Sequence, residues 1–172
     1  LHNHSAKAAL DIAVHDLFGK RFRLPLHTFL GGFRAEMETD LTISLNAPDE
    51  MVRDSLEAVA SGYTALKLKV GGDVELDFQR VAAIRGAVGD MVKIRLDANQ
   101  GWSPKEAVRI IHRLEAEGLG IELIEQPVAR GEDAQLDGYA PVLPLAADES
   151  CTDRSSLAAL ALFFVALAPR LA

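Results

Sequence analysis

Hydrophobic positions along the chain alternate between two patterns, and this alternation predicts the order of the secondary-structure elements. Short apolar runs of the kind found in buried strands occupy residues 41–45, 64–70, 91–98, 121–127 and part of 143–150. Between them lie segments whose apolar residues recur every three or four positions, as in amphipathic helices. Strand and helix therefore alternate, with a repeat of about 25 to 30 residues.

This order is typical of parallel βαβ units joined by right-handed crossovers. It predicts an α/β fold, either an open doubly wound sheet or a (β/α) barrel. The sequence contains no GxGxxG or Walker motif, so we interpret the glycines of "VGGD" (70–73) as a turn into the next helix and not as a phosphate-binding loop.

Two helices are predicted in the first third of the chain. The first covers residues 5–18, where apolar residues recur at helical spacing, and Gly19 is its predicted stop. The second begins at Pro48 and ends at Gly62. The residues that it is expected to turn inward are Val52, Leu56 and Val59.

Two further helices follow the second and third predicted strands. One covers residues 73–88, and one of its faces carries Phe78, Val81, Ala82 and Arg85. The other begins at a capping box formed by Ser103 and Glu106, with Pro104 at the first helical position.

Two lysines stand unusually close together in the strand "YTALKLKV". Lys67 and Lys69 point to the same face, because successive side chains of a strand alternate between faces. One interpretation is an edge strand whose solvent face is rich in lysine, which protects against aggregation. The other is a functional pair, and the ends of the following strands favour it.

Each later strand ends in a carboxylate, and these ends meet at the carboxyl edge of a parallel sheet, where such folds bind ligands. The residues concerned are Asp97, Glu125, and Asp148 with Glu149 beside it. Because neighbouring strands are ~4.8 Å apart, carboxylates at equal heights on three strands can converge on one cation. Hard oxygen donors favour Mg²⁺ or Mn²⁺, and the five histidines are scattered over other segments, which argues against zinc.

Carboxylates that bind a divalent ion, with a lysine beside them, suit the removal of a proton next to a substrate carboxylate. A divalent ion can bind both oxygens of a substrate carboxylate and stabilise the enediolate that forms when the neighbouring carbon loses a proton. A lysine can act as the base if its pKa falls toward neutrality. We expect desolvation and the like charge of Lys67 to lower the pKa of Lys69 in this way.

The composition and net charge limit the classes of partner that the protein is expected to bind. With 49% hydrophobic and 25% charged residues, the chain has the profile of a soluble globular protein. A net charge of -7, from 18 basic and 25 acidic residues, argues against a nucleic acid or an anionic membrane as partner. The longest apolar run, Leu157 to Ala168, has 12 residues and is too short to span a bilayer as a helix. The single Cys151 is compatible with the reducing cytoplasm, where we expect the protein to be located.

The motifs resemble those of the enolase superfamily, in its muconate-lactonising subgroup. The matching stretches are "KLKVG", "RLDANQGW", "IEQP" and "ADES". The longer run "RLDANQGWSPKEAVRIIHRLEAEGLGIELIEQPV" is most similar to the dipeptide epimerases that act on L-Ala-D/L-Glu. The resemblance covers the chain from Ala6 to Asp153.

The resemblance implies a role for each matched residue and a small carboxylate substrate such as a dipeptide. It makes Lys69 an acid/base and Lys67 its electrostatic neighbour. The implied ligands of Mg²⁺, or alternatively Mn²⁺, are Asp97, Glu125 and Asp148, with Asn99 and Glu149 as supporting residues behind them. The motifs also fit muconate cycloisomerases, o-succinylbenzoate synthases and N-acylamino-acid racemases. These activities stay open, as does a catalytically inactive domain that only folds or assembles.

Two features of the family have no counterpart in the sequence. Only the last helix of the N-terminal capping domain is expected in residues 1–35, and no motif like the family's strand-six "NIKL", which carries the second acid/base lysine, follows Asp153. We therefore expect an incomplete enzyme, truncated or frameshifted. Its partial TIM-type (β/α) barrel of about five βα units would occupy residues 36–153, followed by an apolar tail unlike the family at 154–172.

A barrel that lacks strands exposes surfaces that the complete barrel would bury. Five strands cannot close an eight-stranded barrel, so we expect two open sheet edges and an exposed apolar inner face. We expect a homo-oligomer that covers them.

Overall fold

The computed structural model describes residues 3–32, 34, 36–137, 139, 142–152 and 154–160. The chain divides into two units, Leu1–Glu38 and Thr39–Ala172. Residues 161–172, which include most of the predicted apolar tail, lie outside the described residues. Among the residues that are described, no helix is both long enough and apolar enough to cross a membrane.

The second unit is built on a parallel five-stranded sheet. Its strands are β1 (Leu41–Ile43), β2 (Ala65–Lys69), β3 (Lys93–Asp97), β4 (Ile121–Glu125) and β5 (Leu145–Ala146). They lie in the order β1-β2-β3-β4-β5, which is also their order in the sequence. A doubly wound sheet reverses direction at a switch point, whereas a (β/α) barrel adds strands consecutively, so the sheet is an arc of a barrel and confirms that prediction.

The position of β2 in this arc decides between the two interpretations of its lysines. The strand pairs with β1 on one side and with β3 on the other. It is therefore an interior strand, and the edge-strand interpretation was wrong. A lysine pair inside a sheet needs partners of opposite charge, since a buried ammonium without one is costly.

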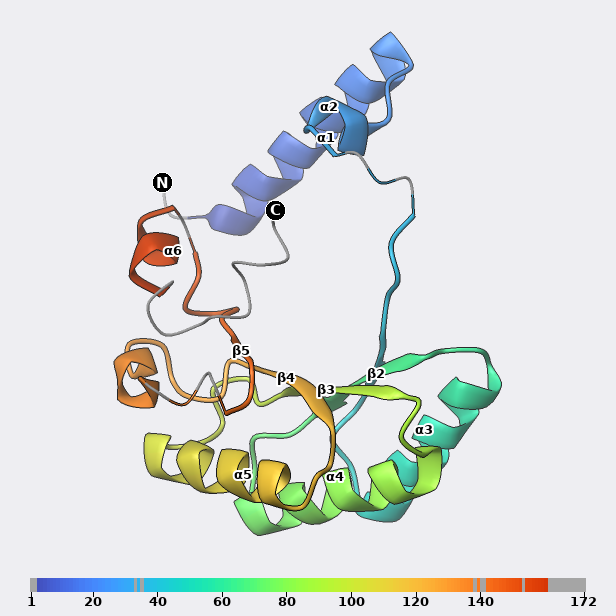
Figure 1. Cartoon of the computed structure of the whole chain (residues 1–172). Coiled ribbons are helices and arrows are strands. Elements are labelled where there is room, and N and C mark those ends of the chain that lie inside the picture. Colours follow the sequence, from blue (N-terminus) through green and yellow to red (C-terminus); the bar gives the residue numbers. More distant parts are fainter. Residues whose placement is uncertain are drawn as a thin grey trace. The chain divides into compact units, whose positions relative to one another are not determined.

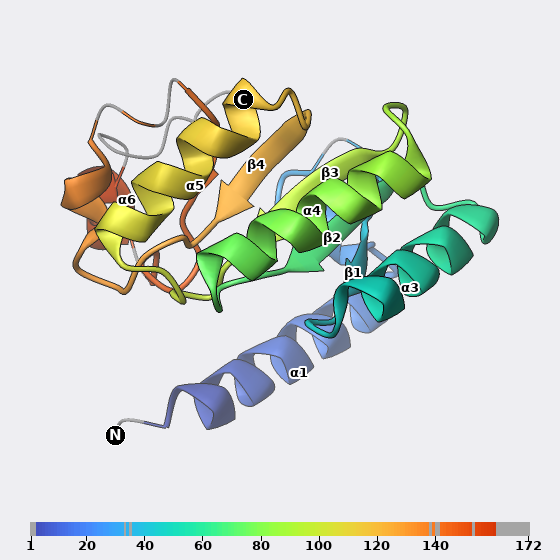
Figure 2. The ribbon, with the colours of Figure 1, turned by 90° about the horizontal axis from the view of Figure 1, so that it is seen from below.

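Three helices cover one face of the sheet, as Figures 1 and 2 show from two directions. They are α3 (Pro48–Ala60), α4 (Val74–Val88) and α5 (Pro104–Ala116), and the short elements η1 (Asp133–Leu136) and α6 (Arg154–Leu160) flank β5 in the sequence. The core lies between this helix layer and the sheet. Its largest fully buried aliphatic side chains are Met51, Leu66, Leu68, Ile84, Ile94, Leu96, Ile110, Ile111, Leu114 and Ile124.

The opposite face of β2 and β3 is charged, so the expected apolar inner face is not found on these two strands. The charges pair across neighbouring strands. Besides the lysine pair, Arg95 binds Glu122 through Nε at 2.6 Å and Asp40 through Nη1 at 2.9 Å. Lys67, Lys69, Arg95 and Asp97 therefore all have partners of opposite charge on this face.

Helix α3 packs Val52 and Val59 against the core as predicted, but its most buried residues lie beside them and Leu56 does not face inward. Its buried residues are Met51, Ser55 and Ala58, whereas the side chain of Leu56 is 45% exposed. The buried stripe is adjacent to the predicted one around the helix, and it carries two small residues. Small side chains permit close approach to neighbouring elements, which the hydrophobic pattern alone did not indicate.

The remaining local signals of this unit are confirmed. The capping box of α5 forms in both directions between Ser103 and Glu106. Asp73 caps α4 by accepting a hydrogen bond from the backbone N–H of Leu76. The turn "VGGD" binds a carboxylate of the chain itself: the N–H groups of Gly71 and Gly72 both donate to Asp77 Oδ2 at 2.9 Å.

The first unit contains α1 (His4–Phe22) and α2 (Leu26–Phe29). Gly19 does not end α1, contrary to the prediction, and the helix stops at Arg23, whose φ of 51° is left-handed. Gly19 has a packing role, because a Cβ there would lie 3.0 Å from the carbonyl oxygen of Leu24 and 3.2 Å from Leu26 Cδ2. The absence of a side chain lets the segment after the helix fold back against it.

Candidate metal centre and lysine pair

The carboxyl ends of β2, β3 and β4 bring four ionisable side chains together. Strand register places Lys69 beside Asp97, and Asp97 beside Glu125. Lys67 lies two residues before Lys69 and therefore points to the same face. The sheet itself thus sets the height of each of these side chains at the edge where barrels of this type bind ligands.

Lys67 connects two carboxylates. Its Nζ donates to both oxygens of Glu125, at 3.1 Å and 2.9 Å, and lies 3.0 Å from Asp97 Oδ2. Burial lowers the pKa of Lys67, but the hydrogen bonds to Glu125 and Asp97 outweigh it, so the pKa lies above its ordinary value. The ammonium form of Lys67 is therefore held by its two acidic partners.

Asp97 is the most buried member of the group, with a side chain only 2% exposed. Its Oδ2 accepts from Lys69 Nζ at 2.6 Å, and its Oδ1 accepts from the backbone N–H of Asn99 at 3.1 Å. Burial raises the pKa of Asp97, and the hydrogen bonds from Lys69 and Lys67 more than offset this, so the pKa lies below its ordinary value. The carboxylate is the stable form at this position.

A second chain of contacts leads from Lys69 to the loop after β5. Lys69 Nζ donates to Asn99 Oδ1 at 2.7 Å, and Asn99 Nδ2 donates to Glu149 Oε1 at 3.2 Å. The other oxygen of Glu149, Oε2, is buried and has no hydrogen-bond partner among the described residues. A buried carboxylate oxygen without a donor is costly, and it marks a place where a cation or a proton donor fits.

Asp148 does not lie at the height of the other two carboxylates. Strand β5 has only two residues, and Glu125 pairs with Ala146, so Asp148 stands two residues beyond the equivalent position. Its side chain is exposed and makes no hydrogen bond or ion pair within the described part of the chain. The expectation of three carboxylates at equal heights therefore holds for Asp97 and Glu125 and fails for Asp148.

The donor set fits a hard divalent cation. The described residues include no group of three His, Cys, Asp or Glu side chains close enough to hold a metal together. However, Asp97 and Glu125 converge on a single positive charge, the ammonium of Lys67, which shows that the space between them accepts a cation. Their carboxylate oxygens, with the unpartnered oxygen of Glu149 and the exposed carboxylate of Asp148 nearby in the sequence, are the ligand type that Mg²⁺ and Mn²⁺ prefer.

The loops that carry the site are held by residues that the sequence pattern does not mark as functional. Asp77 is fully buried and accepts from Trp102 Nε1 at 3.0 Å as well as from the N–H groups after β2. Gly71 and Gly101 touch so closely that a Cβ on Gly101 would lie 2.1 Å from the carbonyl oxygen of Gly71. The loops after Lys69 and Asp97 are therefore fixed to each other. Gln126, which follows Glu125, is also fully buried.

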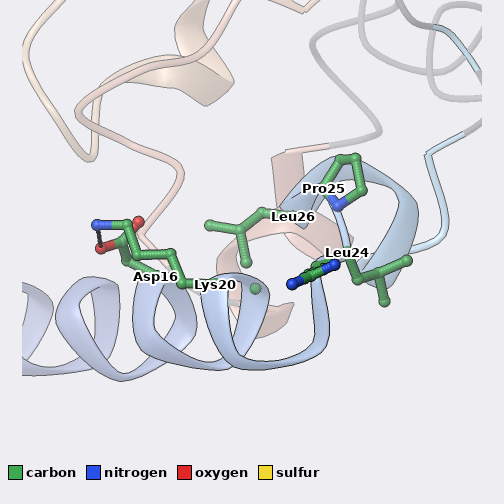
Figure 3. Close-up of a pocket in the computed structure, with 7 residues that line it drawn as sticks. Asp16, Lys20, Leu24, Pro25 and Leu26 are labelled. Atoms are coloured by element: carbon green, nitrogen blue, oxygen red, sulfur yellow. Dashed lines mark hydrogen bonds and ion pairs between the residues drawn. The ribbon is translucent and has the colours of Figure 1, made fainter.

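The first unit also contains a hollow. It has a volume of about 360 Å³ and lies between the end of α1 and the start of α2. Figure 3 shows the residues that line it. Its only acidic side chain, Asp16, is bound to Lys20 at 2.6 Å. With that carboxylate neutralised, the hollow offers no metal site.

Comparison with families of known proteins gives two matches. The model of the enolase C-terminal domain-like family matches residues 50–162. The model of the mandelate racemase/muconate lactonizing enzyme N-terminal domain matches residues 1–31.

Individual relatives are similarly informative. The L-Ala-D/L-Glu epimerase of Clostridium acetobutylicum is 53% identical over 153 residues, which cover 86% of this chain and 42% of the relative. The substrate-liganded L-Ala-D/L-Glu epimerase from Bacillus subtilis superposes with a TM-score of 0.86 at 45% identity, over 91% of this chain and 44% of the other. The dipeptide epimerase of Enterococcus faecalis V583, complexed with Mg and L-Leu-L-Tyr, gives 0.82 at 43% identity, over 88% and 43%. The chain thus spans less than half the length of these relatives.

Proposed function

The chain belongs to the enolase C-terminal domain-like family, and from that premise we propose that its carboxyl-edge site removes the proton next to the carboxylate of a dipeptide, in the manner of a Mg²⁺-dependent dipeptide epimerase. One observation carries the proposal. Lys69, a proton acceptor when neutral, lies against Asp97, and Asp97 and Glu125 both bind the ammonium of Lys67. The similarity to L-Ala-D/L-Glu epimerases supports a dipeptide of the L-Ala-D/L-Glu type as the substrate.

In this proposal Asp97, Glu125 and Asp148 hold the metal ion, and Mn²⁺ is an alternative with the same donor preference. When bound, the ion would neutralise these carboxylates and the charge that the substrate carboxylate gains as its neighbouring carbon loses a proton. Lys67 bridges Asp97 and Glu125 in the structure and sets the positive charge around them. Removal of that ammonium would leave two carboxylates facing each other.

Lys69 is the proposed base. Its neutral Nζ accepts the proton of the α-carbon, the electron pair of the C–H bond moves toward the substrate carboxylate, and the resulting ammonium exchanges its proton with water. The same ammonium then returns a solvent proton to that face of the substrate. Asn99, which accepts from Lys69 and donates to Glu149, orients the amine.

Association with a second copy stays a prediction, as does a cytoplasmic location. Strands β1 and β5 form the two edges of the described sheet, and exposed edges favour pairing with another chain. A folded, soluble monomer in sedimentation experiments at micromolar concentration would contradict the predicted homo-oligomer.

The metal part of the proposal is tested by thermal unfolding with and without ~5 mM Mg²⁺. A ligand that binds only the folded state stabilises it, by about 2.7 kcal/mol at a hundredfold excess over Kd, so the midpoint is expected to rise. Asp97→Asn is expected to abolish the rise. The matched control is Asp90→Asn, which removes an exposed carboxylate before β3, at the opposite edge of the sheet, and is expected to retain it.

The chemical part is tested by incubating the protein with L-Ala-L-Glu and its epimer in D₂O and Mg²⁺. We expect deuterium to replace the α-proton of one epimer, with loss of the exchange in Lys69→Ala and unchanged exchange in Lys105→Ala, an exposed lysine of α5. Exchange that survives in Lys69→Ala would refute this assignment of the base. A folded, Mg²⁺-binding protein that exchanges neither epimer would support a catalytically inactive domain.

A further inference from the structure

Gln126 is a buried amide at the edge of the candidate site. It follows Glu125 directly, its side chain is fully buried, and its backbone lies in the left-handed region with a φ of 38°. Glutamine is rarely completely buried, and a left-handed backbone is uncommon for a residue other than glycine. Both features require compensating contacts.

The amide makes hydrogen bonds with both of its ends. Its Oε1 accepts from the backbone N–H groups of Asp148, at 3.0 Å, and Ser150, at 3.1 Å. Its Nε2 donates to Asp133 Oδ1 at 3.2 Å, to Ser150 Oγ at 2.9 Å and to the carbonyl oxygen of Val128 at 3.0 Å. Because the oxygen faces two N–H groups and the nitrogen faces a carboxylate and a carbonyl, only one orientation of the amide satisfies the contacts.

These contacts continue the sheet where its backbone pairing stops. The parallel ladder between β4 and β5 extends to the bond from the N–H of Gln126 to the carbonyl oxygen of Ala146. Beyond it, in the described part of the chain, the N–H groups of Asp148 and Ser150 bind the side chain of Gln126 and not a strand. Asp133, itself buried, holds the other end of the arrangement by accepting from Ser150 Oγ through both carboxylate oxygens at 2.9 Å.

We propose that Gln126 is the positioning residue for the acidic loop after β5. By binding the N–H groups on both sides of Glu149, the amide fixes Asp148 and Glu149 relative to Glu125 and replaces the strand pairing that β5 is too short to supply. This inference rests on the proposed function, since the loop matters for catalysis only if its carboxylates take part in the metal site. Gln126 contacts the loop and not the proposed substrate.

The test swaps the amide and the carboxylate between Gln126 and Asp133 in two steps. Gln126→Glu keeps an oxygen facing the two N–H groups but turns the other end into a carboxylate against Asp133, and two neighbouring carboxylates repel. Asp133→Asn in the same chain restores a donor between the two side chains and leaves the total charge unchanged. The destabilised control is Arg85→Met, which removes hydrogen bonds to the carbonyl oxygens of Val92 and Leu119 at the opposite edge of the sheet.

Two readouts separate positioning from general stability. The first is Mg²⁺ affinity of each folded variant by calorimetric titration. We expect the Kd for Mg²⁺ to rise about 10- to 100-fold in Gln126→Glu, as it does when residues that support metal ligands are lost. In the double variant we expect it to return to within about threefold of the original value. In Arg85→Met we expect it to stay unchanged. The second is hydrogen exchange of the Asp148 and Ser150 amides without metal, followed by NMR. We expect slow exchange in the original chain, faster exchange in Gln126→Glu and recovery in the double variant.

The outcomes are distinct. If the original chain binds no Mg²⁺ but the exchange pattern is as expected, the proposed function fails while the amide still fixes the loop. If the Asp148 and Ser150 amides of the original chain exchange as fast as an unstructured peptide, or if Gln126→Glu and Arg85→Met weaken Mg²⁺ binding equally, the positioning role is refuted. Failure of the Asp133→Asn change to restore either readout would also refute it.

Discussion

The buried carboxylate of Asp77 offers a sharp test of how the loops at the site are held. Asp77→Ala removes the acceptor of three N–H groups, from Gly71, Gly72 and Trp102, and the partner of Arg80, whose Nη1 lies 2.9 Å from Asp77 Oδ1. The side chain of Arg80 is only 10% exposed, so the change leaves a largely buried guanidinium without its carboxylate. Breaking a buried pair in this way costs about 3–5 kcal/mol.

The individual bonds of Asp77 set the scale of this estimate. A hydrogen bond to a charged group contributes about 1.5–3 kcal/mol, so four independent bonds would exceed the whole expected loss. Water that enters the vacated space compensates part of it, and we expect about 4 kcal/mol for Asp77→Ala, or roughly 8–16 °C in Tm for a chain of this size. Trp102→Phe removes one donor and replaces the buried indole by a smaller phenyl ring, so it is expected to cost at least about 1.5 kcal/mol, from the lost hydrogen bond and the space left behind.

Urea unfolding measures both effects. Trp102 is the only tryptophan of the sequence and lies 3.0 Å from the altered carboxylate, so its fluorescence reports on Asp77→Ala directly, while circular dichroism serves for Trp102→Phe. A free energy of unfolding for Asp77→Ala within ~1 kcal/mol of the original chain would refute the reasoning. Such a small change is typical of the loss of a surface carboxylate and not of a buried carboxylate with several hydrogen bonds.

Three further predictions use the same unfolding assay. Ser103→Ala breaks the capping box of α5 and is expected to cost about 1 kcal/mol, whereas a loss below ~0.3 kcal/mol would mean that the cap is not formed in solution. In α4, a Cβ on Gly86 would meet nothing within 4 Å, so Gly86→Ala is expected to stabilise the protein by about 0.5–1 kcal/mol. Gly101→Ala forces a Cβ against the carbonyl oxygen of Gly71 and is expected to cost at least ~2 kcal/mol. Equal effects of the two substitutions would contradict the close contact between the loops that carry Gly71 and Gly101. Lys67→Met in the absence of metal leaves Asp97 and Glu125 without their shared ammonium and is expected to cost about 2 kcal/mol, with Lys105→Met as a neutral surface control.

The hydrophobic pattern predicted the sheet well because its strands are buried on the helix side, where apolar residues such as Leu66, Leu68, Ile94 and Leu96 recur at alternate positions. Strands β2, β3 and β4 lie inside the predicted ranges, and the convergence of Lys67, Lys69, Asp97 and Glu125 follows from their places near strand ends. Asp148 is different. Its height depends on how many residues of β5 pair with β4, which is a property of the partner strand and has no local signal.

Residues whose role depends on tertiary contacts were not predicted. Asp77 resembles any acidic residue in the first turn of a helix, and only the approach of Trp102 and the glycine turn reveals it as a buried acceptor. Leu56 was assigned to the inward face of α3 because it is large and apolar, yet the neighbouring stripe with Ser55 and Ala58 packs more closely. Gly19 was taken for a helix stop, although its lack of a side chain serves packing between segments.

The agreement between strand order and chain order has a consequence for how the protein folds. Each strand pairs only with its neighbours in the sequence, so the arc can grow one βα unit at a time, and every pairing closes a loop of a single unit. The bond between Lys67 and Glu125 is an exception, because it spans 58 residues and skips a strand. Its geometry requires β2, β3 and β4 to be in register, so we expect this ion pair to form late in folding and to mark an arc that has been assembled in register.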